Sequence, residues 1–368
     1  MLQQFLNTTR IAQITSEIED IRGIPTDLLG LQRVPVVDCD QDEIWMRQGG
    51  RTISADIIAD GAEAVIKSMP QVRLELEHVP NIKGGRALNQ TDLQKLIRLE
   101  TSGLPGDYAS ANSMLNRHVD DALRGCKLTM NFIIWGMLQN SLSYDKNGFK
   151  VTNFNWGTPT DLVVTPAALW TDTTNGKPIT DVNTLAELGR VKYGVRYDRI
   201  TLSTTALRNA SKTDEFKTQA ANRIAVGGST TVAGALLTAM SIEDLKKIAG
   251  AIWGLEVVIY DDTMDIQAVD GTITATRFLA VNRVVLDSTS NDNNRNVMDF
   301  GNAPVDEATV ASIIGHKSPV IGSLTAGERG PLAYAEGEFN PPRIAIWAVT
   351  KGFARKHKET ATAVLIVA

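Results

Sequence analysis

The sequence contains few residues of the types from which catalytic and metal sites are usually built. Only two of its 368 residues are cysteines, Cys39 and Cys126, four are histidines, and 6% are aromatic. One possible bridge is not a disulfide framework, so we expect a reducing compartment. The histidines at 78, 118, 316 and 357 lack metal or catalytic spacing, and there is no HExxH, CxxC or serine in a glycine elbow. We therefore expect no catalytic residue, no metal and no cofactor.

A surplus of positive charge and a long apolar run are also missing. Lysine and arginine number 37 against 42 aspartate and glutamate, a formal net charge of −5, which argues against broad phosphate binding. The start, "MLQQFLNTTRIAQITSEIED", lacks the basic region and apolar core of a signal peptide. The most apolar run, "LTMNFIIWGML" at 128–138, is too short to span a bilayer. We expect a soluble protein that is intracellular when made.

Two patterns that begin like ligand-binding motifs do not continue as such. The acidic run "DCDQDE" at 38–43 starts like a calcium loop, but its sixth position is Glu43 and its twelfth is Gly49, so a solvated strand face is favoured. None of the glycine pairs at 49–50, 84–85 and 227–228 opens a dinucleotide fingerprint or a phosphate loop. The first two pairs bracket one segment, and they are either ordinary tight turns or joints at which it bends.

That segment is predicted to be a long hairpin without a core. Residues 43–48 alternate as the end of a strand that begins in "VPVVDCDQDEIWMRQ", and "QVRLELEHV" at 71–79 alternates again. Between them lie about two dozen residues with little to pack on and no proline before Pro70. A chain that extends such a hairpin needs something else to cover it.

The strongest periodicity predicts one amphipathic helix at 111–140, about 45 Å long at 1.5 Å per residue. Its apolar residues recur at steps of three and four and are Met114, Leu115, Val119, Ala122, Leu123, Cys126, Met130, Ile133, Ile134, Met137 and Leu138. Cys126 falls within the stripe as a small hydrophobic residue, and His118 falls beside it, half-buried. A coiled coil is less favoured, because regular flanking charge pairs are missing.

Shorter elements surround this helix. Helices are predicted at 89–100, at 181–193, at 204–216 behind a Ser or Thr cap, and within 231–254, where Ser241 precedes Asp244 by three. Strands are predicted as a hairpin at 141–157 around Asn147-Gly148, and at 197–203, 255–262, 277–287, 341–354 and 361–368, with an exposed loop at 288–296. Helices and strands mix without a strict βαβ rhythm, so the fold class is α+β.

The order of these pieces resembles the major capsid protein of tailed bacteriophages, with the Hong-Kong-97-type fold, and in particular the phage-lambda capsid protein E family. "RQGGRTISADIIADGAEAVIKSMPQVRLELEHVP" resembles the family's extended loop, and "SLSYDKNGFKVTNFNWGTP" the hairpin after its spine helix. "YDRITLSTTALRNASKTDEF" and "WGLEVVIYDD…TATRFLAVNRVVLD" resemble its axial lobe, and "PPRIAIWAVTKGFARKHKETATAVLIVA" its terminal strands.

The resemblance implies a division of the chain and a set of contact residues. The expected parts are an N-terminal arm (1–36), an extended loop (37–85), a peripheral domain with the spine helix (86–194), an axial domain (195–305) and return strands (306–368). Residues expected at inter-subunit contacts or hinges are Arg47, Gly49, Gly50, Arg51, Ile57, Ile58, Lys67, Gly84, Gly85 and Arg86. Some relatives join their subunits covalently through a Lys–Asn bond. Lys67 is a conceivable donor for such a bond, but no Asn partner can be named, and we expect no covalent cross-link.

The function implied is structural rather than enzymatic. Hexamers and pentamers of the chain would form an icosahedral shell, first as a procapsid, around double-stranded DNA that is bound without sequence specificity. The expected partners are a separate scaffolding protein, a portal and possible decoration proteins. The chain would be assembled in the host cytoplasm and belong to the virion.

Three alternatives remain open on the sequence. An encapsulin-like nanocompartment has the same fold and would carry cargo enzymes instead of a genome, although the hairpin at 141–157 favours the virus. A soluble enzyme with an unfamiliar site would be a monomer or small oligomer. A phage tail tube or sheath would assemble into tubes.

Overall fold

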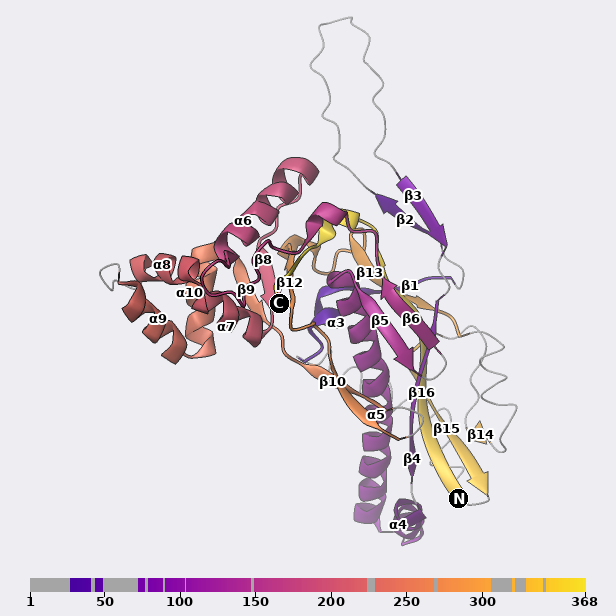
Figure 1. The fold of residues 1–368 in the computed structure, drawn as a ribbon. Helices are drawn as coiled ribbons and strands as arrows, with labels where there is room; N and C mark the ends of the chain where they lie inside the picture. Colours follow the sequence, from indigo (N-terminus) through magenta and orange to yellow (C-terminus); the bar gives the residue numbers. More distant parts are fainter. Residues whose placement is uncertain are drawn as a thin grey trace, which may run out of the picture. The chain divides into compact units, whose positions relative to one another are not determined.

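The computed structural model describes residues 27–40, 44–48, 72–76, 79–88, 90–102, 104–146, 149–223, 229–267, 271–305, 320–321, 329–339 and 342–368 of the chain. Contacts divide the chain into two compact units. Unit 1 contains residues 1–44, 76–134 and 299–354, and unit 2 contains residues 45–75, 135–298 and 355–368. Both units mix helices and strands (Figure 1), so the predicted α+β class is confirmed. The division at residues 36, 85, 194 and 305 stays a prediction.

Unit 1 is built on a six-stranded sheet whose central strand is β16. The strand order is β1-β13-β16-β15-β14, and β4 also pairs with β16. Its strands are β1 (Val36–Asp38), β4 (Asn81–Leu88), β13 (Met298–Ala303), β14 (Val320–Ile321), β15 (Leu332–Phe339) and β16 (Pro342–Lys356). Because residues 344–349 of β16 pair with both β15 and β4, these two neighbours occupy its opposite edges.

Among the described residues, the helices of unit 1 are α3 (Leu29–Arg33), α4 (Gln90–Thr101) and most of α5 (Pro105–Leu138). The predicted spine helix is confirmed, but it begins at Pro105 rather than 111. Pro105 is the first helical residue, a position where the missing N–H of proline is no loss. Every residue of the predicted stripe is buried except the half-buried Met114, and from Met130 onward the helix is buried on all sides.

Unit 2 contains a five-stranded mixed sheet in the order β7-β17-β12-β8-β9. Its strands are β7 (Val163–Val164), β8 (Arg199–Leu202), β9 (Glu256–Ile259), β12 (Arg283–Asp287) and β17 (Ala363–Ile366). The parallel pair β8 and β9 is joined by a crossover whose described residues form the helices α7 to α10, which Figure 1 shows beside the sheet.

The helices of unit 2 are α6 (Pro178–Leu188), α7 (Thr204–Lys212), α8 (Asp214–Arg223), α9 (Thr230–Ala239) and α10 (Ile242–Trp253). Two predicted caps are confirmed: Ser203 Oγ accepts from Ala206 N at 3.1 Å, and Ser241 Oγ accepts from Asp244 N at 3.2 Å. The single helix predicted at 204–216 is wrong.

The chain breaks that helix at Thr213, which has an extended backbone at φ −72° and ψ 150°. Its hydroxyl accepts from Phe216 N at 3.4 Å, so the residue that ends α7 also caps α8.

Three two-stranded ribbons complete the described fold: β2 (Ile44–Gln48) with β3 (Val72–Leu76), β5 (Leu142–Lys146) with β6 (Phe149–Phe154), and β10 (Thr263–Gln267) with β11 (Ile273–Arg277). The first two confirm the predicted hairpins. The third lies between the strands predicted at 255–262 and 277–287, and the second of these predictions is only partly correct. That strand begins only at Arg283, because Phe278 and Leu279 are buried in a turn and Phe278 stacks on Tyr260 with ring centroids 5.9 Å apart.

Candidate assembly surfaces

The ribbon of β2 and β3 lies where the extended loop was predicted. Among the described strands, these two pair with each other and with no other sheet. A two-stranded ribbon is marginally stable in water and leaves two edges that can pair with another chain. Arg47 lies in β2. The other predicted contact residues of this segment, Gly49, Gly50, Arg51, Ile57, Ile58 and Lys67, lie outside the described residues, so they stay predictions.

The second predicted hinge, Gly84, Gly85 and Arg86, lies inside strand β4. The three residues pair in register with Ala348, Trp347 and Ile346 of β16. Neither glycine has a positive φ, so no tight turn explains this pair. The hinge itself stays a prediction.

Packing explains one of the two glycines. A Cβ added to Gly85 would overlap the Trp347 ring, whereas one added to Gly84 would meet nothing within 4 Å. The Lys83 ammonium lies 4.5 Å from the centre of the same ring. The indole therefore rests on the bare backbone of Gly85 beneath the lysine, and this cross-strand contact stabilises the pairing of β4 with β16.

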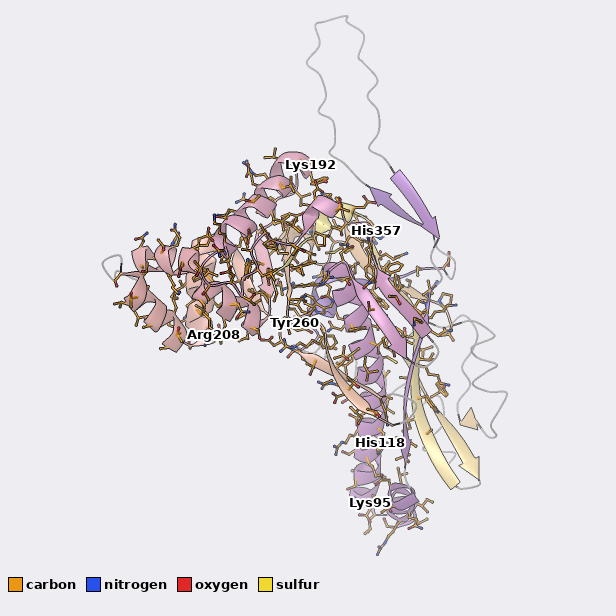
Figure 2. The ribbon with its side chains drawn as sticks, in the orientation of Figure 1. Lys95, His118, Lys192, Arg208, Tyr260 and His357 are labelled. Carbon is orange, nitrogen blue, oxygen red and sulfur yellow. The ribbon has the colours of Figure 1, made fainter. Side chains whose placement is uncertain are left out.

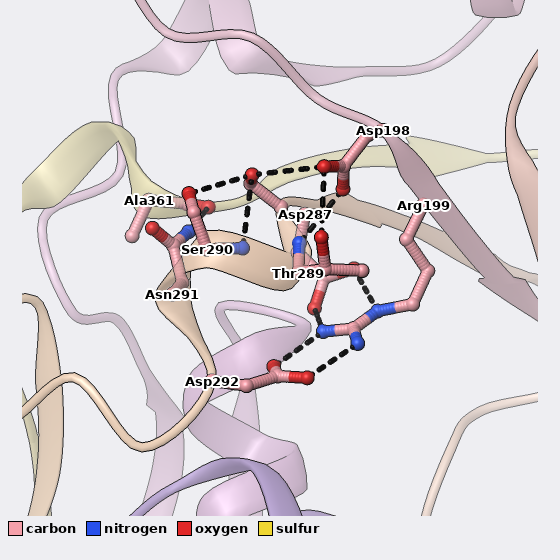
Figure 3. A network of polar contacts seen from close by, with 9 residues as sticks. Asp198, Arg199, Asp287, Thr289, Ser290, Asn291, Asp292 and Ala361 are labelled. Carbon is pink, nitrogen blue, oxygen red and sulfur yellow. Dashed lines mark hydrogen bonds and ion pairs between the residues drawn. The ribbon is translucent and has the colours of Figure 1, made fainter.

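In unit 2 the ion pairs of Arg199 with Asp287 and Asp292, called the ionic clamp below, hold the segment after β12 in place (Figure 3). Arg199 of β8 donates to Asp287 at the end of β12, with Nε at 2.9 Å, and to both carboxylate oxygens of Asp292 at 2.7 Å. The side chains of Arg199 and Asp287 are 5% and 1% exposed, and that of Asp292 is 29% exposed. Burial alone would lower the pKa of Arg199, but the hydrogen bonds to Asp292 and Asp287 outweigh it and raise that pKa.

A neighbouring carboxylate holds the same segment. Asp198 accepts from Thr289 N at 2.7 Å and from its hydroxyl at 2.9 Å. The exposed loop predicted at 288–296 is therefore wrong in part: Ser288 and Asn291 are buried, and Asn291 Nδ2 donates to the Ala361 carbonyl at 3.1 Å. The many polar residues of "STSNDNNRN" serve internal hydrogen bonds as well as solvent.

Both cysteines are buried, and His118 is half-buried. Burial raises the pKa of the Cys126 thiol to about 12, with a backbone hydrogen bond from Gly84 partly offsetting it, so the thiolate is scarce at neutral pH. Cys39 is also buried, and the two do not form a disulfide. His118 is half-buried on α5, as expected.

Two absences hold within the described ranges. These ranges contain no group of three or more His, Cys, Asp or Glu side chains arranged to hold a metal ion. None of their helices combines the length and apolar content needed to cross a membrane.

Comparison with known proteins gives a match in fold but none in sequence. No protein-family model and no curated protein matches the chain. A prophage protein of Escherichia coli CFT073, assigned as a capsid protein, superposes with a TM-score of 0.56 at 12% identity and covers 99% of both chains. A phage-related protein from Bordetella bronchiseptica RB50 gives 0.53 at 14% identity, covering 98% of this chain and 96% of that one.

An encapsulin from Synechococcus elongatus PCC 7942 matches 94% of this chain and 89% of its own, but its TM-score of 0.39 at 10% identity is too low to support an argument. The chain thus has the mixed α+β fold of phage capsid proteins, and the predicted resemblance in fold is confirmed.

Proposed function

We propose that the chain is the major capsid protein of a tailed phage, with the Hong-Kong-97-type fold, and that its copies assemble into the shell. The observation that carries this proposal is the extent of the structural match, 99% of both chains at 12% identity. A likeness confined to one lobe could reflect a common α+β module. One that runs from end to end also includes the segment of the β2–β3 ribbon, whose two strands pair with no other described strand.

The physical basis is a subunit whose outlying parts are covered by its neighbours. An isolated β2–β3 ribbon gains little from its own pairing, but it becomes interface when it lies on another copy. A closed shell repeats each contact many times, and every subunit is held by several neighbours, so each contact can be weak. In this proposal the residues from Arg47 to Lys67 lie in contacts between copies, and Gly84 to Arg86 lie at the joint.

The shell would consist of hexamers and pentamers around double-stranded DNA and would mature from a procapsid. A net charge of −5 suits a container that encloses DNA without adhering to it. Scaffolding would be a separate protein, with a portal and possible decoration proteins as further partners. The role is structural, and the protein belongs to the virion.

Negative-stain microscopy of the purified, concentrated chain tests this proposal. Uniform polyhedral particles or separate capsomers are expected, and particles isolated from phage-producing cells after nuclease treatment should contain nuclease-protected DNA. Tubes would indicate a tail protein, and shells with a copurified enzyme instead of DNA would indicate a nanocompartment. A dispersed monomer at every concentration, with or without a scaffolding protein, would contradict shell formation.

A further inference from the structure

Helix α9 is apolar on two sides. Its sequence, "TTVAGALLTA", contains no ionisable residue. Ala233 and Leu237 are buried in unit 2, at 0% and 1% exposure. The other side of the helix exposes four apolar residues at positions i, i+3, i+4 and i+7, namely Val232 (47%), Ala235, Leu236 (38%) and Ala239. At 100° per residue these four form a second stripe about 100° wide, as wide as the face a helix normally buries.

Hydrogen bonds with side chains outside the helix hold both ends of α9, so the position of the exposed stripe is fixed. Ser229 caps the first turn by accepting from Val232 N. At the other end the Arg208 guanidinium of α7, labelled in Figure 2, donates to the carbonyls of Leu237 at 3.3 Å and Met240 at 3.0 Å. A cation at a helix C-terminus satisfies orphan carbonyls and complements the helix dipole. The stripe is therefore presented by an anchored helix.

A groove of about 950 Å³ runs beside the stripe, between α8 and α9. Small residues of α9, Gly234, Ala235 and Thr238, form one wall, and Lys217 and Thr218 of α8 line the other. Ala235 belongs to both the stripe and the groove, so the two surfaces are adjacent. Val232 and Leu236 form a ridge of larger side chains beside a hollow lined by small ones. One copy cannot bring its own ridge to its own groove.

We propose that the α9 stripe is a self-association surface, in which the Val232–Leu236 ridge of one copy lies in the α8–α9 groove of the next. The inference rests on the proposed shell function and names a contact within it. A ridge and a groove at different places make a head-to-tail contact, and such contacts close into rings when the rotation permits.

Charge and area favour a second copy as the occupant. The stripe carries no charge, and the groove is lined by Lys212, Lys217 and Asp214, of which Lys217 and Asp214 pair at 3.0 Å. This is too little positive charge to hold a nucleic-acid backbone. Four small or medium apolar side chains also cover far less than the roughly 800 Å² per partner of a stable pairwise interface. A contact of this size holds only where further contacts support it, and a neighbouring subunit in a ring supplies such contacts.

Two experiments on the full-length chain test the contact. In the first, Leu236→Glu is compared with Val191→Glu, which introduces the same charge at another exposed valine of unit 2 (58%). We expect Leu236→Glu to raise the concentration at half-assembly, measured by light scattering, at least about tenfold, and Val191→Glu to change it less than about twofold. Circular dichroism and thermal melting check that both variants are folded.

The second experiment does not depend on shell formation. Leu236→Cys, mixed between ¹⁴N- and ¹⁵N-labelled copies at high concentration, is treated with a short maleimide–succinimide linker. The buried Cys39 and Cys126 give little background. Mixed-isotope peptides that join position 236 to Lys212 or Lys217 support the contact. Their absence, or normal assembly of folded Leu236→Glu, overturns it. If the wild-type chain forms no shell, the proposed function fails, and the cross-link alone decides the contact.

Discussion

Replacement of Arg199 by methionine should strongly destabilise unit 2, because it breaks a buried ion pair. Methionine keeps a long side chain but leaves Asp287, only 1% exposed, as a buried carboxylate without its guanidinium. Removal of one partner from a buried ion pair costs about 3–5 kcal/mol, because the remaining charge stays buried without its opposite charge. We expect a loss of that size in the free energy of unfolding.

Two further variants test whether the loss of stability in Arg199→Met comes from the broken ion pair with Asp287. Asp292→Asn removes one carboxylate that is 29% exposed and leaves Arg199 paired with Asp287, so we expect a smaller loss of about 1–2 kcal/mol. Arg196→Met, three residues before Arg199 and exposed, is the matched control and should change stability by less than about 0.5 kcal/mol.

Urea unfolding at a concentration below assembly measures these differences. Tryptophan fluorescence reports on unit 2, because Trp170 and Trp253 are buried there and lie 6.2 Å apart. The expected order of stability is Arg196→Met, then Asp292→Asn, then Arg199→Met. If the free energy of unfolding of Arg199→Met lay within about 1 kcal/mol of the wild-type value, the ionic clamp would not determine stability and the reasoning would be refuted.

Three further predictions concern other contacts. Gly85→Ala should cost about 1–3 kcal/mol through overlap with the Trp347 ring, whereas Gly84→Ala, which has open space, should be neutral or slightly stabilising; equal effects in urea unfolding would disprove the packing explanation. Cys126, with its pKa near 12, should react with a thiol reagent at pH 8 only after denaturation, and rapid reaction of the native chain would show that it is accessible. Burial would raise the pKa of Asp261, but hydrogen bonds from the start of α7 and from Arg277 outweigh burial and lower that pKa. The stability that Asp261 confers is therefore present above the unfolded pKa of about 4, and it is lost as the pH falls through the lower folded pKa. Asp261→Asn should flatten that part of the curve of unfolding free energy against pH.

Local patterns predicted much of the fold. The spacing of apolar residues predicted α5, because a helix buries one face with a period near 3.6 and the stripe is long enough to be unambiguous. Ser203 and Ser241 were recognisable as caps from the serine and the helix that follows it. The ribbon of β2 and β3 was predicted from two alternating runs.

Features that depend on distant or competing contacts were not predicted. Arg199 meets Asp287 and Asp292 across 88 and 93 residues, and no local pattern relates positions so far apart. Phe278 and Leu279 extend an apolar run that looks like a strand, but the chain buries them in a turn. Helix α9 lies in the stretch at 231–254 that was predicted to be helical, but its sequence does not show which side the described chain leaves exposed. The predicted contacts beyond Arg47 and at Gly84 to Arg86 need a second copy of the chain to be tested.

The central claim is that the β2–β3 ribbon is covered by another copy of the chain and not by its own. Hydrogen–deuterium exchange of the amides of Ile44–Gln48 and Val72–Leu76, compared between unassembled and assembled protein, tests it most directly. We predict fast exchange in the unassembled chain and strong protection after assembly, while β12, inside its five-stranded sheet, is protected in both states. Equal protection of the ribbon in both states would contradict the claim.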